Sequence, residues 1–443
     1  MPDPALDFPG SWDEIAAARA AALRVTLDLA ATRHPLTCRK LAEAGLTRAD
    51  IATPADLARL PITTKAELMA RPEDALLDLD GAAVPEEQRV TWDTMHTTGS
   101  SSGRPTPFVS TTSDFWDILI LQRRMLEIRG VTQDDRIANL FPLTRHPHGA
   151  FIRVLHAAAA LHIPVVSALP GNPGPGFAVG QELDGVVHTL ARTRPTILWG
   201  VPSYMRRVVA RAGELGVALP DLRLVFVTGE GLSEEGRGDL LARLAAIGAP
   251  DARVSISYGM TEIQGGLVEC AAGHGLHNPH PEAIAIDVVD PVTHAPLPDG
   301  EEGLILLSHM RRRGTLLLRY AVGDLGVRST APCPHCGRVT ERILGTPRRA
   351  DDLTKIRGML VNPVLALAAV EGVAAVRDFR FEISRSGALG MDEFVLLVVA
   401  EPGVEALLAK RVKDAIGVTP RVVLAERIEG ESWKAKRWVD QRA

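Results

Sequence analysis

A run of hydroxyl-bearing residues and glycines occupies residues 96–107, with the sequence HTTGSSSGRPTP. Glycine takes backbone angles that other residues avoid, so two glycines in this run allow successive N–H groups to turn toward one anion. The hydroxyls are further donors, and an arginine adds positive charge. The run therefore predicts a phosphate-binding loop. Its residues are Thr98, Gly99, Ser100, Ser101, Ser102, Gly103 and Arg104.

Two other interpretations of this run are weaker. A flexible Ser/Gly linker has a similar composition, but apolar, patterned sequence lies on both sides of the run. The P-loop of nucleoside triphosphatases needs GxxxxGK[ST] at the start of a helix. Here Arg104 stands in place of the lysine, the second glycine comes one residue early, and Pro105 with Pro107 disfavours an immediate helix. We therefore reject the P-loop.

Three strand-like apolar segments end in residues that suit a nucleotide. LRLVFVTGEG ends in a glycine turn where a flat ring can lie against the backbone. RVSISYGMTE ends in an aromatic ring that can cover a purine, a threonine that can donate to phosphate and a glutamate that can ligate Mg²⁺. LLLRYAVGD ends in an aspartate suited to ribose hydroxyls. Alone, each segment also fits an ordinary turn. The residues are Gly229, Glu230, Gly231, Tyr258, Gly259, Met260, Thr261, Glu262 and Asp324.

The segments around these residues predict the elements that position them. Strand-like and helix-like segments alternate between residues 136 and 259, which is typical of a mostly parallel sheet with helices packed on it. Ligands of such sheets bind where strands end. Thr64 and Glu67 have the spacing of a capping box, and Ser113 or Asp114 can cap the helix that precedes Gly130.

In this order the motifs resemble those of the adenylate-forming superfamily: a Ser/Thr/Gly loop followed by Gly, Arg and Pro, then [FY]-G-x-[TS]-E, then Y-x-x-G-D. The segments PITTKAEL, VPSYM, IRGMLVNP and WKAKRWVD are similar to the phenylacetate–CoA ligase branch of that superfamily. The resemblance covers nearly the whole chain. It implies an α/β fold with a large N-terminal domain of mostly parallel sheets and packed helices, and a small mobile C-terminal α+β domain.

The same resemblance implies two domains with different roles. Residues 1–347 would form the adenylation domain that binds ATP and the acid, and residues 348–443 would form a swivelling domain that carries the catalytic lysine. Lys434 matches that lysine, and Lys436 is the alternative.

The hinge region departs from the family pattern. The family has G-R-x-D-D, whereas here the letters TPR separate Gly345 from Arg349. Arg349 is expected to contact ribose or phosphate, and Arg348 is its possible substitute.

The resemblance also implies a reaction, ATP-dependent activation of a small carboxylic acid, expected to be an aryl acid, with pyrophosphate release. The acyl adenylate would then pass to a thiol, with coenzyme A expected. Catalytic roles fall to Lys434, Glu262, Thr261 and Arg104, with Glu262 holding Mg²⁺. Alternatives are another acid or acceptor, namely a carrier-protein thiol, an amine, or nitrite activation for N–N bond formation. A non-catalytic nucleotide-binding homologue is an alternative of another class. Arg145, His146 and His148 favour a polar or anionic acid if they face the pocket.

Cysteines suggest a separate metal site. Cys333 and Cys336 have the two-residue separation that lets both thiolates reach one tetrahedral ion. A second pair of ligands could be Cys270 with His274 or His277, and we favour His277. Reduced cysteines in a turn are the competing interpretation. The prediction is a structural zinc ion, because none of these ligands lies in the nucleotide motifs.

Composition excludes several other classes of function. The chain has 443 residues, of which 46% are hydrophobic, and a net charge of −5, so it shows no broad basic surface for nucleic acid. No apolar run reaches the roughly 18–20 residues of a membrane span, and the acidic, proline-rich start is no signal peptide. A cytoplasmic protein with small-molecule partners follows. A homodimer is a further expectation.

Overall fold

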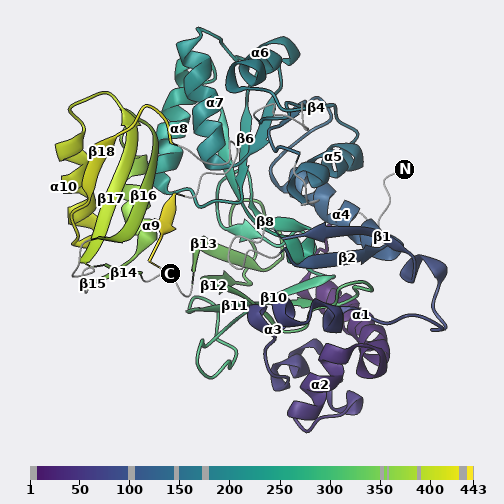
Figure 1. The fold of residues 1–443 in the computed structure, drawn as a ribbon. Helices are drawn as coiled ribbons and strands as arrows, with labels where there is room; N and C mark the ends of the chain where they lie inside the picture. The colour runs from purple at the N-terminus through teal and green to yellow at the C-terminus, as the bar shows by residue number, and fades with distance from the viewer. Residues whose placement is uncertain are drawn as a thin grey trace. The chain divides into compact units, whose positions relative to one another are not determined.

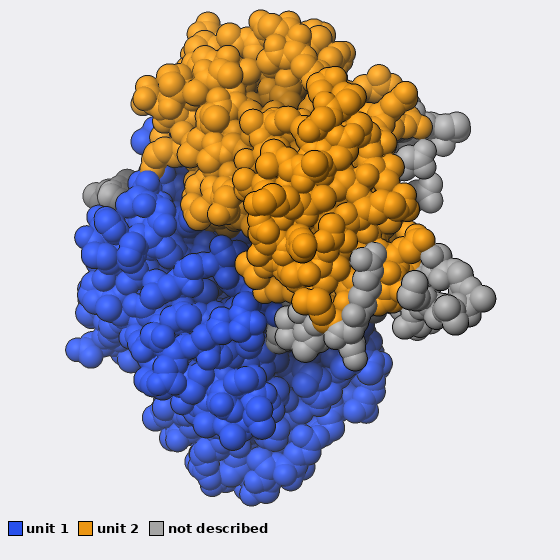
Figure 2. All heavy atoms as spheres, turned by 90° about the vertical axis from the view of Figure 1, so that its left-hand side faces the viewer, with its two compact units in different colours: residues 1–133, 144–162, 257–350 blue, residues 134–143, 163–256, 351–443 orange. Residues whose placement is uncertain are grey.

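The structure is a computed structural model that describes residues 7–97, 105–143, 149–171, 179–349, 354–356, 359–386, 391–428 and 437–442. The chain divides into two compact units, which Figure 2 shows in different colours. Unit 1 comprises residues 1–133, 144–162 and 257–350, and unit 2 comprises residues 134–143, 163–256 and 351–443. The predicted boundary between residues 347 and 348 is a different division and stays a prediction.

Unit 1 begins with helices that pack on a cluster of buried aliphatic side chains, which includes Leu23, Leu27, Met310 and Leu316. The helix containing Lys65 starts as predicted, because Thr64 accepts from the N–H of Glu67 and Glu67 accepts from the N–H of Thr64. The elements of this part are α1 (Trp12–Arg33), α2 (Pro35–Glu43), η2 (Arg48–Asp50), η3 (Pro54–Arg59), α3 (Lys65–Ala70), η4 (Pro72–Ala75) and η5 (Glu86–Gln88).

An antiparallel hairpin of β1 (Thr91–His96) and β2 (Pro107–Thr111) brackets the predicted phosphate loop. The base of the loop is closed by hydrogen bonds from Thr97 N to Thr106 O, at 3.0 Å, and from Thr106 N to Thr97 Oγ1, at 2.9 Å. Helix α4 (Thr112–Ile128) follows at once. The predicted cap was wrong: Thr111 caps α4, and Asp114 completes the capping box from within the helix.

The sheet strands of unit 1 are antiparallel neighbours in the order β10-β11-β12-β13-β9-β8. The second half of β7 pairs antiparallel with β8. Helix α5 (Gly149–Leu161) also belongs to this unit. The strands are β7 (Arg253–Met260), β8 (Gly265–Glu269), β9 (Leu276–His277), β10 (Ile284–Val289), β11 (Glu302–His309), β12 (Tyr320–Ser329) and β13 (Arg342–Arg349).

Unit 2 contains the parallel strands that the alternating pattern predicts. Strands β4, β3, β5 and β6 lie side by side in that order, and each adjacent pair is parallel. Strands β5 and β6 are almost wholly buried and apolar, as parallel strands covered on both faces usually are. The elements are β3 (Ile137–Asn139), β4 (Val165–Ser167), α6 (Leu183–Thr193), β5 (Ile197–Gly200), α7 (Pro202–Glu214), β6 (Leu224–Thr228) and α8 (Glu234–Ala246).

The last part of unit 2 is a small α+β fold with its own core, as predicted. Its four-stranded sheet has the order β18-β17-β16-β19, and Phe379, Phe381 and Phe394 lie in the core. Helix α7 contacts β6 and also β16, so this part packs on α7 (Figure 1). The elements are β14 (Thr354–Ile356), β15 (Met359–Val361), α9 (Pro363–Glu371), β16 (Val376–Ser386), β17 (Met391–Ala400), α10 (Glu405–Ile416), β18 (Arg421–Leu424) and β19 (Trp438–Asp440).

The α/β fold predicted from the sequence is thus confirmed. Its parallel pairs gather in unit 2, and antiparallel pairs make up the sheet in unit 1. Of the helices formed by described residues, none combines the length and the apolar character that crossing a membrane requires.

Candidate active site

A tight turn follows β7 and carries two of the predicted residues. Residues Thr261–Ile263 form a single 3₁₀ turn, η6, and Gln264 then takes a φ of 56° before β8 begins. A Cβ on Gly266 would lie 2.9 Å from the carbonyl oxygen of Tyr258, so only glycine lets β8 approach β7 this closely. Gly259 is exposed, whereas Tyr258 is partly buried. The chain therefore turns sharply just after the aromatic ring and presents Thr261 and Glu262 there.

The carboxylate of Glu262 lies in a partly buried position. Its Oε1 accepts a hydrogen bond from the hydroxyl of Tyr320, at 3.2 Å. Burial raises the pKa of Glu262 above its ordinary value, although the positive charges of Lys65 and Arg349 act in the opposite direction. A carboxylate in this setting gains from a cation, because a cation compensates the lost hydration.

His309 holds the backbone of the same residue. Its Nδ1 accepts from the N–H of Leu317 at 3.1 Å, so the proton is on Nε2, which donates to the carbonyl of Glu262 at 3.0 Å. Burial lowers the pKa of His309 to about 3, so the ring is neutral at physiological pH. A neutral histidine fixes the turn without placing a competing charge beside Glu262.

Asp324 connects two other predicted residues. The hydroxyl of Tyr258 donates to its Oδ2, and Nε of Arg349 lies 3.3 Å from its Oδ1. Asp324 and Arg349 are register partners on β12 and β13. Gly323 precedes Asp324 with a φ of 87°, a conformation that favours glycine. Burial and the charge of Asp324 both raise the pKa of Tyr258, so the phenol stays protonated and remains a donor.

The strand also decides between the two neighbouring arginines. Successive side chains of a strand point to opposite faces. Arg348 makes a bidentate ion pair with Glu302, with distances of 2.9 and 2.5 Å. Arg349 is therefore the arginine that lies with Asp324, and Arg348 faces the other side of β13.

Gly229, Glu230 and Gly231 belong to unit 2 and follow β6. Gly229 has a φ of 85°, as a glycine turn requires. The carboxylate of Glu230 accepts from the backbone N–H of Ser203 at 3.1 Å and from its hydroxyl at 2.9 Å. Because Ser203 lies in the first turn of α7, Glu230 satisfies an N–H group that the helix leaves open.

Several predicted residues lie outside the described part of the chain. They include the whole phosphate loop and both candidate lysines, as well as the polar residues proposed near the acid. They are Thr98, Gly99, Ser100, Ser101, Ser102, Gly103, Arg104, Arg145, His146, His148, Lys434 and Lys436.

The four predicted metal ligands come together in unit 1. The ligand atoms of Cys270, His277, Cys333 and Cys336 all lie within 4.8 Å of one another. Sγ of Cys336 is 3.3 Å from Nε2 of His277. Zinc binds thiolate at about 2.3 Å in tetrahedral geometry, so two thiolates of one ion lie about 3.8 Å apart. The alternative ligand, His274, has its Nδ1 beside Arg342, at 2.9 Å.

The electrostatics of this cluster suit metal binding. Burial lowers the pKa of His277 to about 4, so its ring is neutral. Nδ1 donates to the carbonyl of Gly275 at 3.1 Å, which leaves the lone pair of Nε2 toward the cysteines. Burial opposes ionisation of Cys333, but backbone N–H groups of His335 and Cys336 outweigh it and lower the pKa of this thiol. The imidazole is thus already neutral, as a metal ligand must be, and loss of the proton from the Cys333 thiol is made easier.

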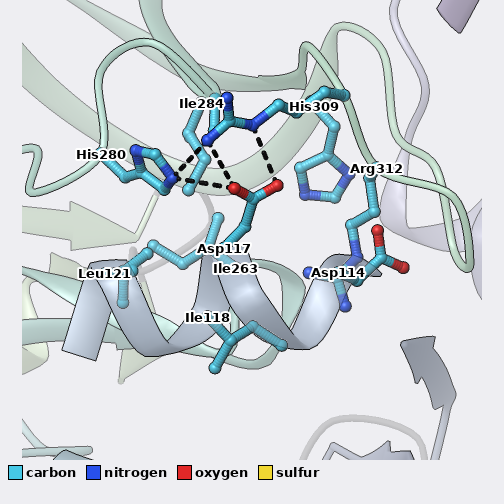
Figure 3. Close-up of a pocket in the computed structure, with 11 residues that line it drawn as sticks. Asp114, Asp117, Ile118, Leu121, Ile263, His280, Ile284, His309 and Arg312 are labelled. Carbon is cyan, nitrogen blue, oxygen red and sulfur yellow. Dashed lines mark hydrogen bonds and ion pairs between the residues drawn. The ribbon is translucent and has the colours of Figure 1, made fainter. Parts of the chain in front are cut away.

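A separate cavity lies beside α4 and includes Ile263 among its lining residues (Figure 3). Figure 3 shows the carboxylate of Asp117 pointing toward His280. Asp117 accepts from Arg311 at 3.0 and 2.5 Å, and its Oδ1 is 3.3 Å from Nε2 of His280. Because these charges already pair with one another, they stabilise the junction of α4 with the loops around it.

Comparisons with known proteins agree with the motifs. Residues 175–311 match the model of the AMP-binding enzyme family. The chain is 27% identical over 440 residues to phenylacetate–coenzyme A ligase of Thermus thermophilus, with 93% of each chain covered. It is 26% identical over 419 residues to the ligase of that name from Pseudomonas putida, with 91% of this chain and 88% of the relative covered. The chain is thus similar to phenylacetate–coenzyme A ligases over nearly its whole length.

The predicted resemblance to the phenylacetate–CoA ligase branch is therefore confirmed. Among solved structures, 2-hydroxyisobutyryl-CoA ligase in the postadenylation state with 2-HIB-AMP has a TM-score of 0.80 at 22% identity. This likeness covers 99% of the present chain and 92% of that chain, and it supports the fold. The region that matches the family model contains Gly229, Tyr258 and Glu262.

The sequence motifs gave no role to two residues of the unit 1 site, although Tyr320 is the tyrosine of Y-x-x-G-D. Tyr320 belongs to the same strand as Asp324, four residues earlier. That spacing was a usable signal. No sequence signal pointed to His309, because its partner is a backbone carbonyl on a turn that is distant in the sequence.

Proposed function

We propose that this protein activates a small carboxylic acid with ATP as an acyl adenylate and then transfers the acyl group to a thiol, that of coenzyme A. The observation that carries this proposal is the grouping of Tyr258, Asp324 and Arg349 beside Glu262 in one sheet, in a chain similar to phenylacetate–coenzyme A ligases. The side chains offer a ring, ribose acceptors and a metal-ligating carboxylate in one unit.

In the first half-reaction, an oxygen of the substrate carboxylate attacks the α-phosphorus of ATP, and the bond to the β-phosphate oxygen breaks. Pyrophosphate leaves with the electron pair. Asp324 would accept from the ribose hydroxyls, and Arg349 would hold the same sugar or a phosphate oxygen. Magnesium, when bound, neutralises charge on the phosphates. Glu262 is the side chain that would hold it, and Thr261 would donate to the α-phosphate.

In the second half-reaction, a thiolate attacks the carbonyl carbon and AMP leaves. We propose that Lys434, within a C-terminal domain of residues 348–443, stabilises charge between carboxylate and α-phosphate in the first step only. Residues 98–104 would hold the β and γ oxygens. The phosphates that the loop would hold are anionic, and Lys434, on a separate segment, is cationic. This arrangement fits a reaction that depends on positioning and charge neutralisation.

We further propose that the cysteine and histidine cluster holds a structural zinc ion. Cys270 follows β8 and Cys333 follows β12, whereas Glu262 precedes β8 and Asp324 lies in the first half of β12. Arg342 and Arg349, at the two ends of β13, are separated by seven residue steps, roughly 24 Å. The ion would therefore tie the strands together at the end remote from the nucleotide. Four protein ligands leave no open position for catalysis.

The test of the reaction is pyrophosphate release from ATP and Mg²⁺ with a panel of aryl, aliphatic, hydroxylated and amino acids plus nitrite, with and without coenzyme A. Release with one acid that rises when coenzyme A is present supports the proposal and names the acid. Pyrophosphate release that does not change when coenzyme A is added indicates a carrier-protein thiol or an amine as acceptor. ATP binding without release for any acid contradicts the proposal and favours a nucleotide-binding protein without turnover.

A further inference from the structure

A buried arginine connects the hairpin of the phosphate loop to the turn that carries Glu262. Arg153 lies on α5 and is 4% exposed. Its Nη2 donates to Oδ2 of Asp93 at 2.8 Å, on β1, and to Oε1 of Gln264 at 2.9 Å. Its Nε also points at Oε1 of Gln264, at 3.2 Å, and its Nη1 lies 2.9 Å from Nδ1 of His156. One guanidinium on α5 therefore contacts two other segments of unit 1, strand β1 and the turn before β8.

Gln264, whose side chain Arg153 holds, in turn holds the backbone of the turn. Its Nε2 donates to the carbonyl of Thr261 at 2.8 Å, and its own carbonyl accepts from Nε2 of Gln122 at 2.7 Å. Because Arg153 supplies donors to Oε1, the amide can only be oriented with Nε2 toward Thr261. The residue has a positive φ of 56°, which costs a non-glycine residue about 1 kcal/mol or more, so external support is needed to keep it there.

Asp93 forms the other end of the connection. It lies on β1, five residues before the predicted phosphate loop, and its side chain is 15% exposed. In its surroundings of low dielectric, a charged hydrogen bond is stronger than in water. His156 stays neutral, because burial and the charge of Arg153 lower its pKa to about 4. The guanidinium thus pairs with the carboxylate of Asp93.

We infer that Asp93, Arg153 and Gln264 are positioning residues that hold the Thr261–Gln264 turn in register with the β1–β2 hairpin. The inference rests on the proposed function in one respect, the binding of magnesium by Glu262. If Arg153 is removed, the amide of Gln264 loses its fixed orientation and the carbonyl of Thr261 loses its donor. Glu262 then has to be ordered when the metal binds, so affinity for the Mg²⁺ complex of ATP falls.

The experiment measures equilibrium binding of ATP by calorimetry, with and without Mg²⁺, for wild type and for Arg153→Met, Gln264→Met and Asp93→Asn. Arg123→Met is the matched control, since it breaks the 2.7 Å ion pair of Arg123 with Glu127 on α4. We expect the Kd of Mg²⁺-ATP to rise roughly tenfold in the first two variants, in line with the loss of one hydrogen bond to a charged group. Binding of ATP without Mg²⁺ and binding by the control should stay within about twofold.

A double-variant cycle separates positioning from general weakening of the fold. Glu262→Gln combined with Gln264→Met should bind Mg²⁺-ATP no worse than Glu262→Gln alone, because both changes remove the same metal contact. Additive losses, equal losses with and without Mg²⁺, or wild-type binding by Gln264→Met would overturn the inference. If Arg153→Met does not fold, Gln264→Met decides.

The outcomes also separate this inference from the proposed function. A Mg²⁺-specific loss in the variants of a protein that never releases pyrophosphate supports the positioning role and contradicts the ligase activity. Pyrophosphate release by a wild type whose variants bind Mg²⁺-ATP normally supports the ligase and contradicts the positioning role. Absence of any ATP binding by wild type contradicts both.

Discussion

The hydroxyl of Tyr320 donates a hydrogen bond to Oε1 of Glu262 at 3.2 Å. The first residue of β12 is thereby linked to the turn that follows β7. Four residues later on the same strand, Asp324 accepts from the hydroxyl of Tyr258. One strand therefore supplies a partner for the proposed metal ligand and a partner for the proposed adenine-binding ring. This relationship explains why a Tyr-x-x-x-Asp spacing can serve both halves of a nucleotide site.

Tyr320→Phe removes the hydroxyl and leaves the ring in the core. We expect the Mg²⁺ concentration for half-maximal pyrophosphate release to rise roughly fivefold, since one hydrogen bond to a charged group orients Glu262. The fold should persist, because the ring still fills its site. Titration of Mg²⁺ at saturating ATP measures the effect. An unchanged half-saturation would show that Tyr320 does not orient the ligand.

The pH dependence of magnesium binding should reflect the raised pKa of Glu262. Burial favours the neutral acid, so a proton must leave before the cation binds. As pH falls, half-saturation by Mg²⁺ should therefore begin to rise at a pH above the ordinary glutamate value of 4.5. The same group adds stability at low pH that is lost as pH rises through its folded-state pKa. Glu262→Gln should abolish this pH dependence, and a wild-type profile that is flat down to pH 4.5 would contradict the assignment.

Substitutions of Tyr258 separate the ring from the hydroxyl. Tyr258→Ala should raise the KM for ATP roughly tenfold, because stacking of a base on an aromatic ring contributes about 1–3 kcal/mol. Tyr258→Phe keeps the ring and should change the KM by less than about threefold. Initial rates of pyrophosphate release measure both values. If the two variants lose affinity equally, the hydroxyl bond to Asp324 rather than stacking carries the effect.

Removal of the proposed zinc ion should lower the stability of the fold. It should leave unchanged the activity of the molecules that remain folded. Metal analysis of the purified protein should find about one zinc per chain. Cys333→Ser should lower the free energy of unfolding by roughly 3 kcal/mol or more, as loss of a structural metal does. Cys38→Ser is the control, since Sγ of Cys38 lies 3.2 Å from the carbonyl of Ala31, remote from the cluster. A metal-free protein of normal stability would contradict the zinc site.

The residues at strand ends could be predicted because each follows an apolar run directly. Tyr258 and Glu262 stand at and just after the end of β7, whereas Asp324, which was expected at the end of a strand, lies within β12, which continues to Ser329. Only the structure could decide between adjacent residues that both fitted a role. Arg349 was separated from Arg348 only by the alternation of β13. The helix cap was misplaced for a similar reason, since several hydroxyl residues precede α4.

The positioning network could not be predicted from spacing. Arg153 stands in an otherwise apolar helix, GAFIRVLHAAAAL, and Gln264 stands more than a hundred residues later. Their contact depends on how α5 packs beside β8, which no local pattern encodes. A single charge within an apolar helix was the available signal, because a buried arginine requires partners.

In the proposed function, acid activation and thiol transfer are two steps of one reaction. The most direct measurement is a product balance, in which AMP, pyrophosphate and consumed coenzyme A thiol are quantified together for the acid that the panel identifies. We expect equal amounts of the three, and none without the acid. Formation of ADP in place of AMP, or AMP release that leaves the thiol unconsumed, would contradict it.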